Sequence, residues 1–129
     1  MTTRPTIITT LHAALLLAAT AAHAVTLSTP PLHPDAGGRL VCTAVHIGQR
    51  DVGITAQIMG DARQNVTDFV STEWSSENAG MLASVTAESS ADDARYCTVT
   101  VTGGGRSQVR AALEAFDADG VRTAIVEAR

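Results

Sequence analysis

The sequence predicts an all-β protein, an antiparallel sandwich of seven or eight short strands. Three observations lead to this prediction. Apolar and polar residues alternate with a period of two through most of the chain after residue 38, clusters of turn-forming residues separate the alternating stretches, and Cys42 and Cys97 lie on two different stretches. Alternation of this kind is typical of strands with one buried face, and short strands at regular intervals are typical of sandwiches and barrels.

Residues 1–24 have the order of a secretory signal peptide. A short segment with Arg4 as its only charge precedes an apolar run around Leu15–Leu17, and the tripeptide Ala22-His23-Ala24 follows it. This order matches the n-region, h-region and A-x-A cleavage site of exported proteins. A buried N-terminal helix is the alternative. We expect a cleavable signal helix, a mature chain that begins at Val25, and a periplasmic or secreted protein with no membrane insertion after removal of the signal.

Residues 25–38 are rich in proline and glycine and predict an extended segment, in which Val25–Ser28 has the composition of a short edge strand. The sandwich domain is expected over residues 39–129. Its first stretch, LVCTAVHIG, is apolar on both faces, with Val41, Val45 and Ile47 opposite the face of Cys42. Either the second face awaits a partner, or a β-bulge switches the faces midway, and the bulge is the favoured interpretation.

The alternation is clean in the middle of the chain. Residues 52–58, 81–87 and 97–101 each place apolar side chains on one face, with Met81 at the start of the second set. The stretch SQVRAALEAF (107–116) fits both a helical stripe and a strand. The turn signal DADG and the β-rich run VRTAIVEA come directly after it and favour a closing hairpin, so a strand is predicted.

The two cysteines are expected to form a disulfide bond, because exported proteins meet an oxidising environment. Closing so long a loop removes about 4 kcal/mol of unfolded-state entropy in the chain-entropy model. The alternatives are a metal-bound thiolate and a catalytic thiol. The second is disfavoured, since no histidine lies near Cys97 in the sequence.

The layout resembles immunoglobulin-like sandwiches, which bridge their second and sixth strands, and the segment DDARYC is similar to their segment of tyrosine before cysteine. It differs in two respects. Tyr96 directly precedes Cys97 and so faces away from it, and Trp74 does not follow Cys42 on the next strand. The chain also resembles small exported bacterial β-sandwich proteins with one cysteine pair, a likeness that implies no activity.

The composition narrows the function classes. The chain carries a net charge of −4, has no lysine and has no basic cluster, so nucleic acid is an improbable partner. No G-x-S-x-G motif accompanies the histidines, and the paired acids lie in turn-like segments. We therefore expect no enzyme and no cofactor.

The function that remains is interaction with an unknown protein or cell-surface partner, through an exposed strand edge or an apolar face. Val41, Val45 and Ile47 form the candidate face, and Trp74, beside the polar turn SSENAG, is a separate candidate anchor. The alternative function is a periplasmic soft-metal protein of the copper type, with His33, His46 and Met59 as ligands. In the absence of metal, His46 is expected at a strand end, half exposed.

Overall fold

The computed structural model describes residues 23–60, 70–75, 77, 80–88 and 94–129, so residues 1–22, with most of the predicted signal segment, lie outside it. The described residues contain eight strands and, before β7, the 3-10 turn η2. The elements are β1 (Val25–Ser28), β2 (Arg39–His46), β3 (Val52–Gly60), β4 (Val70–Trp74), β5 (Leu82–Glu88), β6 (Arg95–Thr102), η2 (Arg106–Gln108), β7 (Val109–Phe116) and β8 (Arg122–Glu127).

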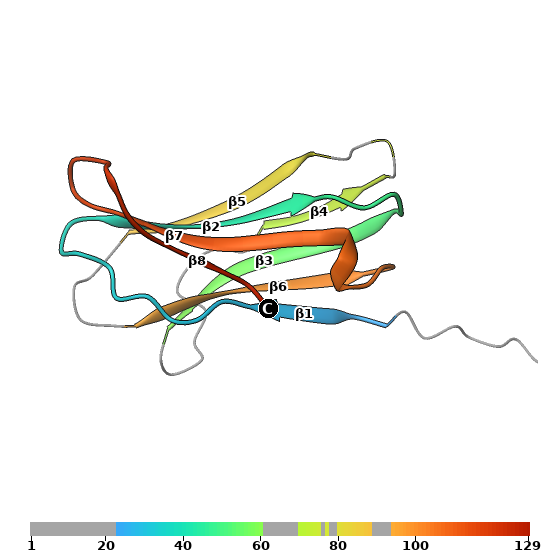
Figure 1. The fold of residues 1–129 in the computed structure, drawn as a ribbon, viewed down its shortest axis with the longest axis horizontal. Helices are drawn as coiled ribbons and strands as arrows, with labels where there is room; N and C mark the ends of the chain where they lie inside the picture. The colour runs from blue at the N-terminus through green and yellow to red at the C-terminus, as the bar shows by residue number, and fades with distance from the viewer. Residues whose placement is uncertain (1–22, 61–69, 76, 78–79, 89–93) are drawn as a thin grey trace, which may run out of the picture.

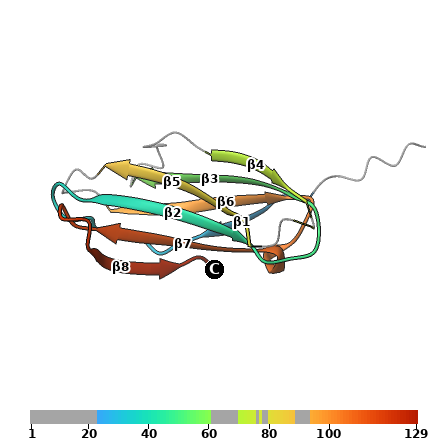
Figure 2. The ribbon, with the colours of Figure 1, turned by 90° about the horizontal axis from the view of Figure 1, so that it is seen from above.

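The strands form two antiparallel sheets of four, in the orders β1-β6-β3-β4 and β5-β2-β7-β8. Figures 1 and 2 show the sheets stacked as two layers, with the C-terminus close to β1. This arrangement confirms the predicted sandwich. The expected extended segment also takes part in it, because β1 pairs with β6 from Val25 to Ser28.

The core between the layers follows from the alternation. In each of the four central strands every second side chain is buried, so the two sheets turn their apolar faces toward each other. The largest fully buried apolar side chains are Leu40, Ile54, Ile58 and Leu113. Trp74 is the one aromatic residue in this core among the described residues, and Val, Ile, Leu and Ala fill most of the space.

A disulfide bond joins the two layers near their centres. Cys42 lies in β2 of one sheet and Cys97 in β6 of the other, with 5.7 Å between their Cα atoms. Both residues are fully buried. The predicted pairing of the two cysteines is therefore confirmed, and both central strands that carry them are held by the bond as well as by apolar packing.

The strand pairing agrees with the immunoglobulin arrangement around the disulfide and departs from it at the end of the chain. The pairs β2–β5 and β3–β6 flank the bridge, as do the corresponding pairs in that family. However, β7 leaves the sheet of β6 and pairs with β2, and β1 lies beside β6. In the immunoglobulin layout the strand after the second cysteine instead pairs with the cysteine strand itself.

The two ambiguous stretches of the sequence are both regular strands. Residues 109–116 form β7, as favoured, and a turn closes its hairpin, in which the Asp117 carboxylate accepts the amide N–H groups of Asp119 and Val121 at 3.0 and 2.8 Å. The expected bulge in β2 is wrong. The strand pairs in unbroken register with β5 and β7, so Val41 and Val45 emerge on its outer face.

The disulfide yields a first prediction. The double variant Cys42→Ala/Cys97→Ala should lose about 4 kcal/mol of unfolding free energy, because its unfolded chain regains the entropy of an open loop. Urea unfolding of the oxidised protein and of the variant measures the difference. Reduction of the native protein before unfolding is the matched control and should give a similar loss. Equal midpoints for oxidised protein and variant would contradict the prediction.

Candidate functional site

The outer face of the sheet β5-β2-β7-β8 carries the three apolar residues that the sequence predicted as an interaction face. Residues opposite each other in an antiparallel pair share a face, so the register gives the neighbours directly. Val41 and Val45 are half-buried on this face, Val45 lies between Leu82 of β5 and Arg110 of β7, and Ile47 follows at the end of the strand. The structure therefore places the three predicted side chains together on one outer face.

Three of these side chains form an apolar patch, defined here as Val45, Ile47 and Leu82. Leu82 is 64% exposed and Ile47 is 46% exposed. The backbone fixes the patch, because Leu82 is the direct cross-strand partner of Val45 and the Ile47 N–H donates to the Gln108 carbonyl at 2.9 Å, which extends the β2–β7 ladder. The three side chains are neighbours on one sheet face, and contiguous exposed apolar surface of this kind can mark an interaction site.

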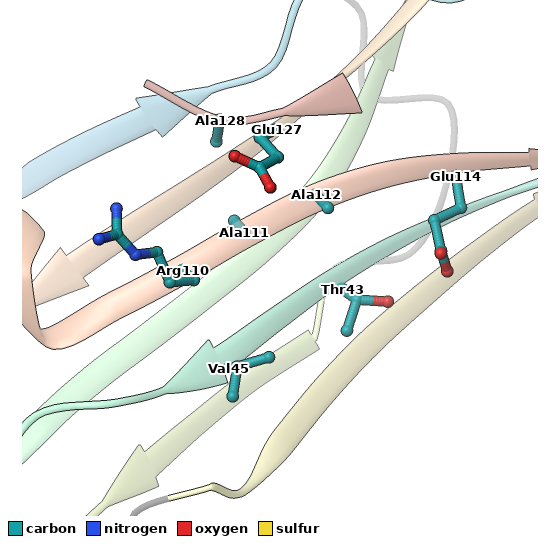
Figure 3. Close-up of a pocket in the computed structure, with 8 residues that line it drawn as sticks. All are labelled: Thr43, Val45, Arg110, Ala111, Ala112, Glu114, Glu127 and Ala128. Carbon is teal, nitrogen blue, oxygen red and sulfur yellow. The ribbon is translucent and has the colours of Figure 1, made fainter. Parts of the chain in front are cut away.

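A hollow of about 560 Å³ lies next to the patch. Its lining residues are Thr43, Val45, Arg110, Ala111, Ala112, Glu114, Glu127 and Ala128. The hollow has a simple cause. Ala112 lies between Arg110 and Glu114 along β7 and pairs with Glu127 of β8, so a methyl group stands among three long charged side chains (Figure 3). Apolar contact with the patch and polar contact with the hollow are thus available side by side.

The charges at the far end of the same face are already paired within the chain. Arg122 donates to the Glu114 carboxylate at 2.8 Å, and the Arg39 guanidinium lies over the Phe116 ring at 4.8 Å. Arg110 and Glu127 form no ion pair within the described ranges. Beside the patch, Arg110 and Glu127 are therefore available to bind a ligand. At the far end of the face, the charged side chains already interact with each other or with Phe116.

Trp74 does not lie at the surface, so its predicted role as an exposed anchor is wrong. Only 4% of the residue is exposed. The cause is its position on β4: Trp74 pairs with Val52, and its side chain points into the core. Its ring stacks on the His46 ring with 5.6 Å between centroids, and the two side chains close this end of the core.

His46 is fully buried, whereas the sequence predicted a half-exposed side chain. Its Nε2 donates to the Arg50 carbonyl oxygen at 3.0 Å, which leaves Nδ1 as a buried acceptor without a partner among the described residues. A buried acceptor of this kind costs about 1–3 kcal/mol. The stacking on Trp74 and the bond to Arg50 show that His46 serves the fold at the end of β2.

The three residues of the metal alternative are not brought together. His33 is exposed in the segment before β2, and Met59 lies on the outer face of β3. His46 stacks on Trp74 beside Val52, and Met59 is seven positions further along β3, about 23 Å away at the rise of a strand. Both cysteine sulfurs are used by the disulfide, and no group of three His, Cys, Asp or Glu side chains in the described part of the chain is arranged to hold a metal.

Sequence reasoning missed Leu82, Arg110 and Glu127. The exposure of Leu82 could have been predicted from the sequence. Leu82 alternates with the apolar core positions of β5 and so lies on the same outer face as Ser84, Thr86 and Glu88. The sequence instead placed Met81 on the core face. Met81 is 51% exposed. The backbones of Gly80 and Met81 both bond to His46, so the regular alternation of inward and outward side chains in β5 begins only at Leu82. The positions of Arg110 and Glu127 near the patch could not be predicted from the sequence, because they depend on which strands pair in the sheet.

Comparison with protein-family models, curated proteins and solved structures gave no match to this chain. Within the residues that the structure describes, no helix has the length and hydrophobicity that a membrane span needs. The functional proposal therefore rests on the geometry of the outer face.

The size of the loss in stability should distinguish the buried Trp74 ring from the exposed apolar patch. Trp74→Ala should lower the unfolding free energy by about 3–5 kcal/mol, because it opens a cavity over His46. Ile47→Ala should change it by no more than about 0.5 kcal/mol, as expected of an exposed position. Thermal and urea unfolding of both variants give the comparison. A stable Trp74→Ala variant would contradict the structural role of the ring.

Proposed function

We propose that this protein is an exported, non-enzymatic module that binds a protein or cell-surface partner through the outer face of the sheet β5-β2-β7-β8. The exposure of the apolar patch is the observation that carries the proposal. Leu82 and Ile47 are 64% and 46% exposed on the outer face of a regular sheet, and Ile125 of β8, opposite Glu114 on the same face, is 51% exposed. Their burial against a partner would contribute about 25 cal/mol for each Å² of apolar surface removed from water.

The outer face of the other sheet has a different composition, which supports the choice of the face of β5-β2-β7-β8 as the binding surface. On the sheet β1-β6-β3-β4 the outward positions are mostly hydroxyl-bearing or otherwise polar, among them Thr55, Thr98, Thr100 and Ser71. Thr55 and Ser71 bond to each other through their hydroxyl oxygens at 3.3 Å. The polar groups of this face bond to one another or meet water, apart from the Thr98 Oγ1, which is buried without a partner among the described residues. The two faces of one small sandwich therefore differ in character, and the apolar one is the better candidate for binding.

The chemistry of the face favours a polypeptide partner over a small substrate. Val45, Ile47 and Leu82 suit an aliphatic or aromatic side chain, and Arg110 and Glu127 suit polar or charged neighbours of either sign. Glu114 is held by Arg122 and so is poorly placed for acid–base work. A mixed surface of this kind resembles the apolar centre and polar rim of protein interfaces. The soft-metal alternative is not carried further, because its ligands lie apart.

Export is supported by the disulfide and by the signal-like order of residues 1–24. A buried disulfide persists in oxidising compartments and is rare in the cytosol. The acidic net charge of −4 argues against nucleic acid as the partner. The proposed location is the periplasm or the exterior of the cell.

Site-specific photo-crosslinking in the source cell tests the interaction. A photoreactive amino acid at Ile47 should capture a partner, because this position would be covered in the complex. The same probe at Ser71, exposed on the opposite outer face, is the matched control and should capture nothing. A product with Ile47 that disappears when Leu82→Glu is added would support the proposal. Identical results at Ile47 and Ser71 would contradict it.

Export has its own test. Protein isolated from the cell envelope or medium should begin at Val25, since cleavage is expected after the small residue Ala24. Intact-mass measurement identifies this end. Ala24→Trp should leave the precursor uncleaved, whereas Ala18→Val, within the apolar run, should not. A full-length native chain confined to the cytosol would refute export.

A further inference from the structure

The four edge strands of the sandwich differ in how well they are protected. The free side of β1 is partly occupied, because Ser28 exchanges backbone hydrogen bonds with Arg129 at 3.2 and 3.5 Å. The register of β8 is interrupted opposite Ala115 and Phe116, and β4 has only five residues. By contrast, β5 pairs with β2 in unbroken register over seven residues and ends its sheet in Figure 2.

The direction of the free backbone groups of β5 follows from one hydrogen bond. The His46 N–H donates to the Met81 carbonyl at 3.1 Å, which sets the phase of the antiparallel ladder. Ala83, Val85 and Ala87 consequently direct their N–H and C=O groups to β2. Those of Leu82, Ser84, Thr86 and Glu88 point away from β2, and within the described ranges no backbone partner meets them. At the end of the strand the Glu88 carbonyl accepts one hydrogen bond from the Arg95 guanidinium at 2.9 Å, and its second lone pair remains for another donor.

The strand lacks the usual features that prevent edge pairing. Natural edge strands are protected by proline, lysine, bulges or inward-pointing charges. From Leu82 to Thr86 the strand has no charge and no proline, and its inward side chains Ala83, Val85 and Ala87 are apolar. Glu88, at the last position, carries the only charge on the strand. An edge of this composition is a template for another strand.

We propose that β5 pairs with β5 of a second copy of this chain, antiparallel about a twofold axis at Val85. Among the antiparallel registers, this one pairs the whole strand. It puts Ser84 opposite Thr86 of the second copy, where their hydroxyl groups can bond, and Leu82 opposite its Glu88. An axis at Glu88 would instead oppose two carboxylates directly.

The charge distribution fits this symmetric partner. In the proposed register the two Glu88 side chains lie six positions apart along the paired strands, about 20 Å, so their repulsion is screened at physiological salt. Each Glu88 also lies beside Arg39 of its own chain, its partner in the β2–β5 register. The product is one continuous eight-stranded sheet, with an isologous interface of the kind most common in dimers.

The dimer would leave both apolar patches accessible. Leu82 lies at one end of β5 and Glu88 at the other, so the patches of the two copies occupy opposite ends of the joint strand pair. The outer face would thus be presented twice. This inference does not depend on the proposed partner protein, because the backbone edge carries it and Ile47 plays no part in the pairing.

Analytical ultracentrifugation of the exported protein tests the pairing from about 5 to about 500 μM, a range suited to a small interface. The native protein should show a concentration-dependent monomer–dimer equilibrium. Ser84→Pro removes one outward N–H group and no bond to β2, and should weaken association at least about tenfold. Thr26→Pro makes the equivalent change on the edge of β1 and should associate like the native protein.

Two results would overturn the dimer: a native protein that stays monomeric throughout the range, or a folded Ser84→Pro variant that associates as tightly as the native protein. Should Ser84→Pro fail to fold, amide exchange of the native protein decides. The amides of Ser84 and Thr86 should gain protection as concentration rises, while that of Thr26 should not, and unchanged exchange at Ser84 and Thr86 would refute the pairing. Failure here leaves the crosslinking result at Ile47 unaffected, so the two proposals can fail separately.

Discussion

The covalent bond between Cys42 and Cys97 is the constraint on which the architecture depends. It joins β2 and β6, each an interior strand of its sheet, at a Cα separation of 5.7 Å. A small domain built on alanine, valine and threonine buries few large side chains, and small domains commonly need such a link. Because the bond fixes which faces of β2 and β6 point inward, it also fixes what lies outside.

The side chains on the outer face of β2 are determined by the inward direction of Cys42. With Cys42 directed into the core, strand alternation sends Val41, Thr43 and Val45 outward. The neighbours of Val45 are then decided by strand order, which puts Leu82 on one side and Arg110 on the other. The apolar patch is therefore a product of register and topology together. Neither the sequence of β2 nor that of β5 creates it alone.

The fold could be predicted from the sequence because its determinants are local. A period of two, turn residues at intervals and two cysteines in alternating stretches are sufficient to indicate a cysteine-bridged sandwich. Even the ambiguous stretch 107–116 was resolved by the turn after it, where Asp117 accepts two backbone N–H groups. The outward position of Val41 and Val45 also follows from alternation, once β2 is known to be free of a bulge.

The errors arose where contacts between distant segments decide the outcome. Trp74 follows a polar-looking stretch and precedes a turn, yet its pairing with Val52 turns it inward onto His46. His46 was expected at a half-exposed end for the same reason, since nothing near it in the sequence announces the ring that covers it. Arg110 and Glu127 become neighbours of the patch only because β7 crosses to the sheet of β2, a step that no local pattern encodes.

The state of the two sulfur atoms in the native protein is the most direct test. Protein isolated after export should be unfolded without reductant, treated with a thiol-alkylating reagent and weighed. The account predicts a mass two hydrogens below that of the dithiol chain, no alkylation, and one cross-linked peptide containing both Cys42 and Cys97. Two alkylated cysteines would contradict it, because the layers would then lack the bond that defines their inner and outer faces.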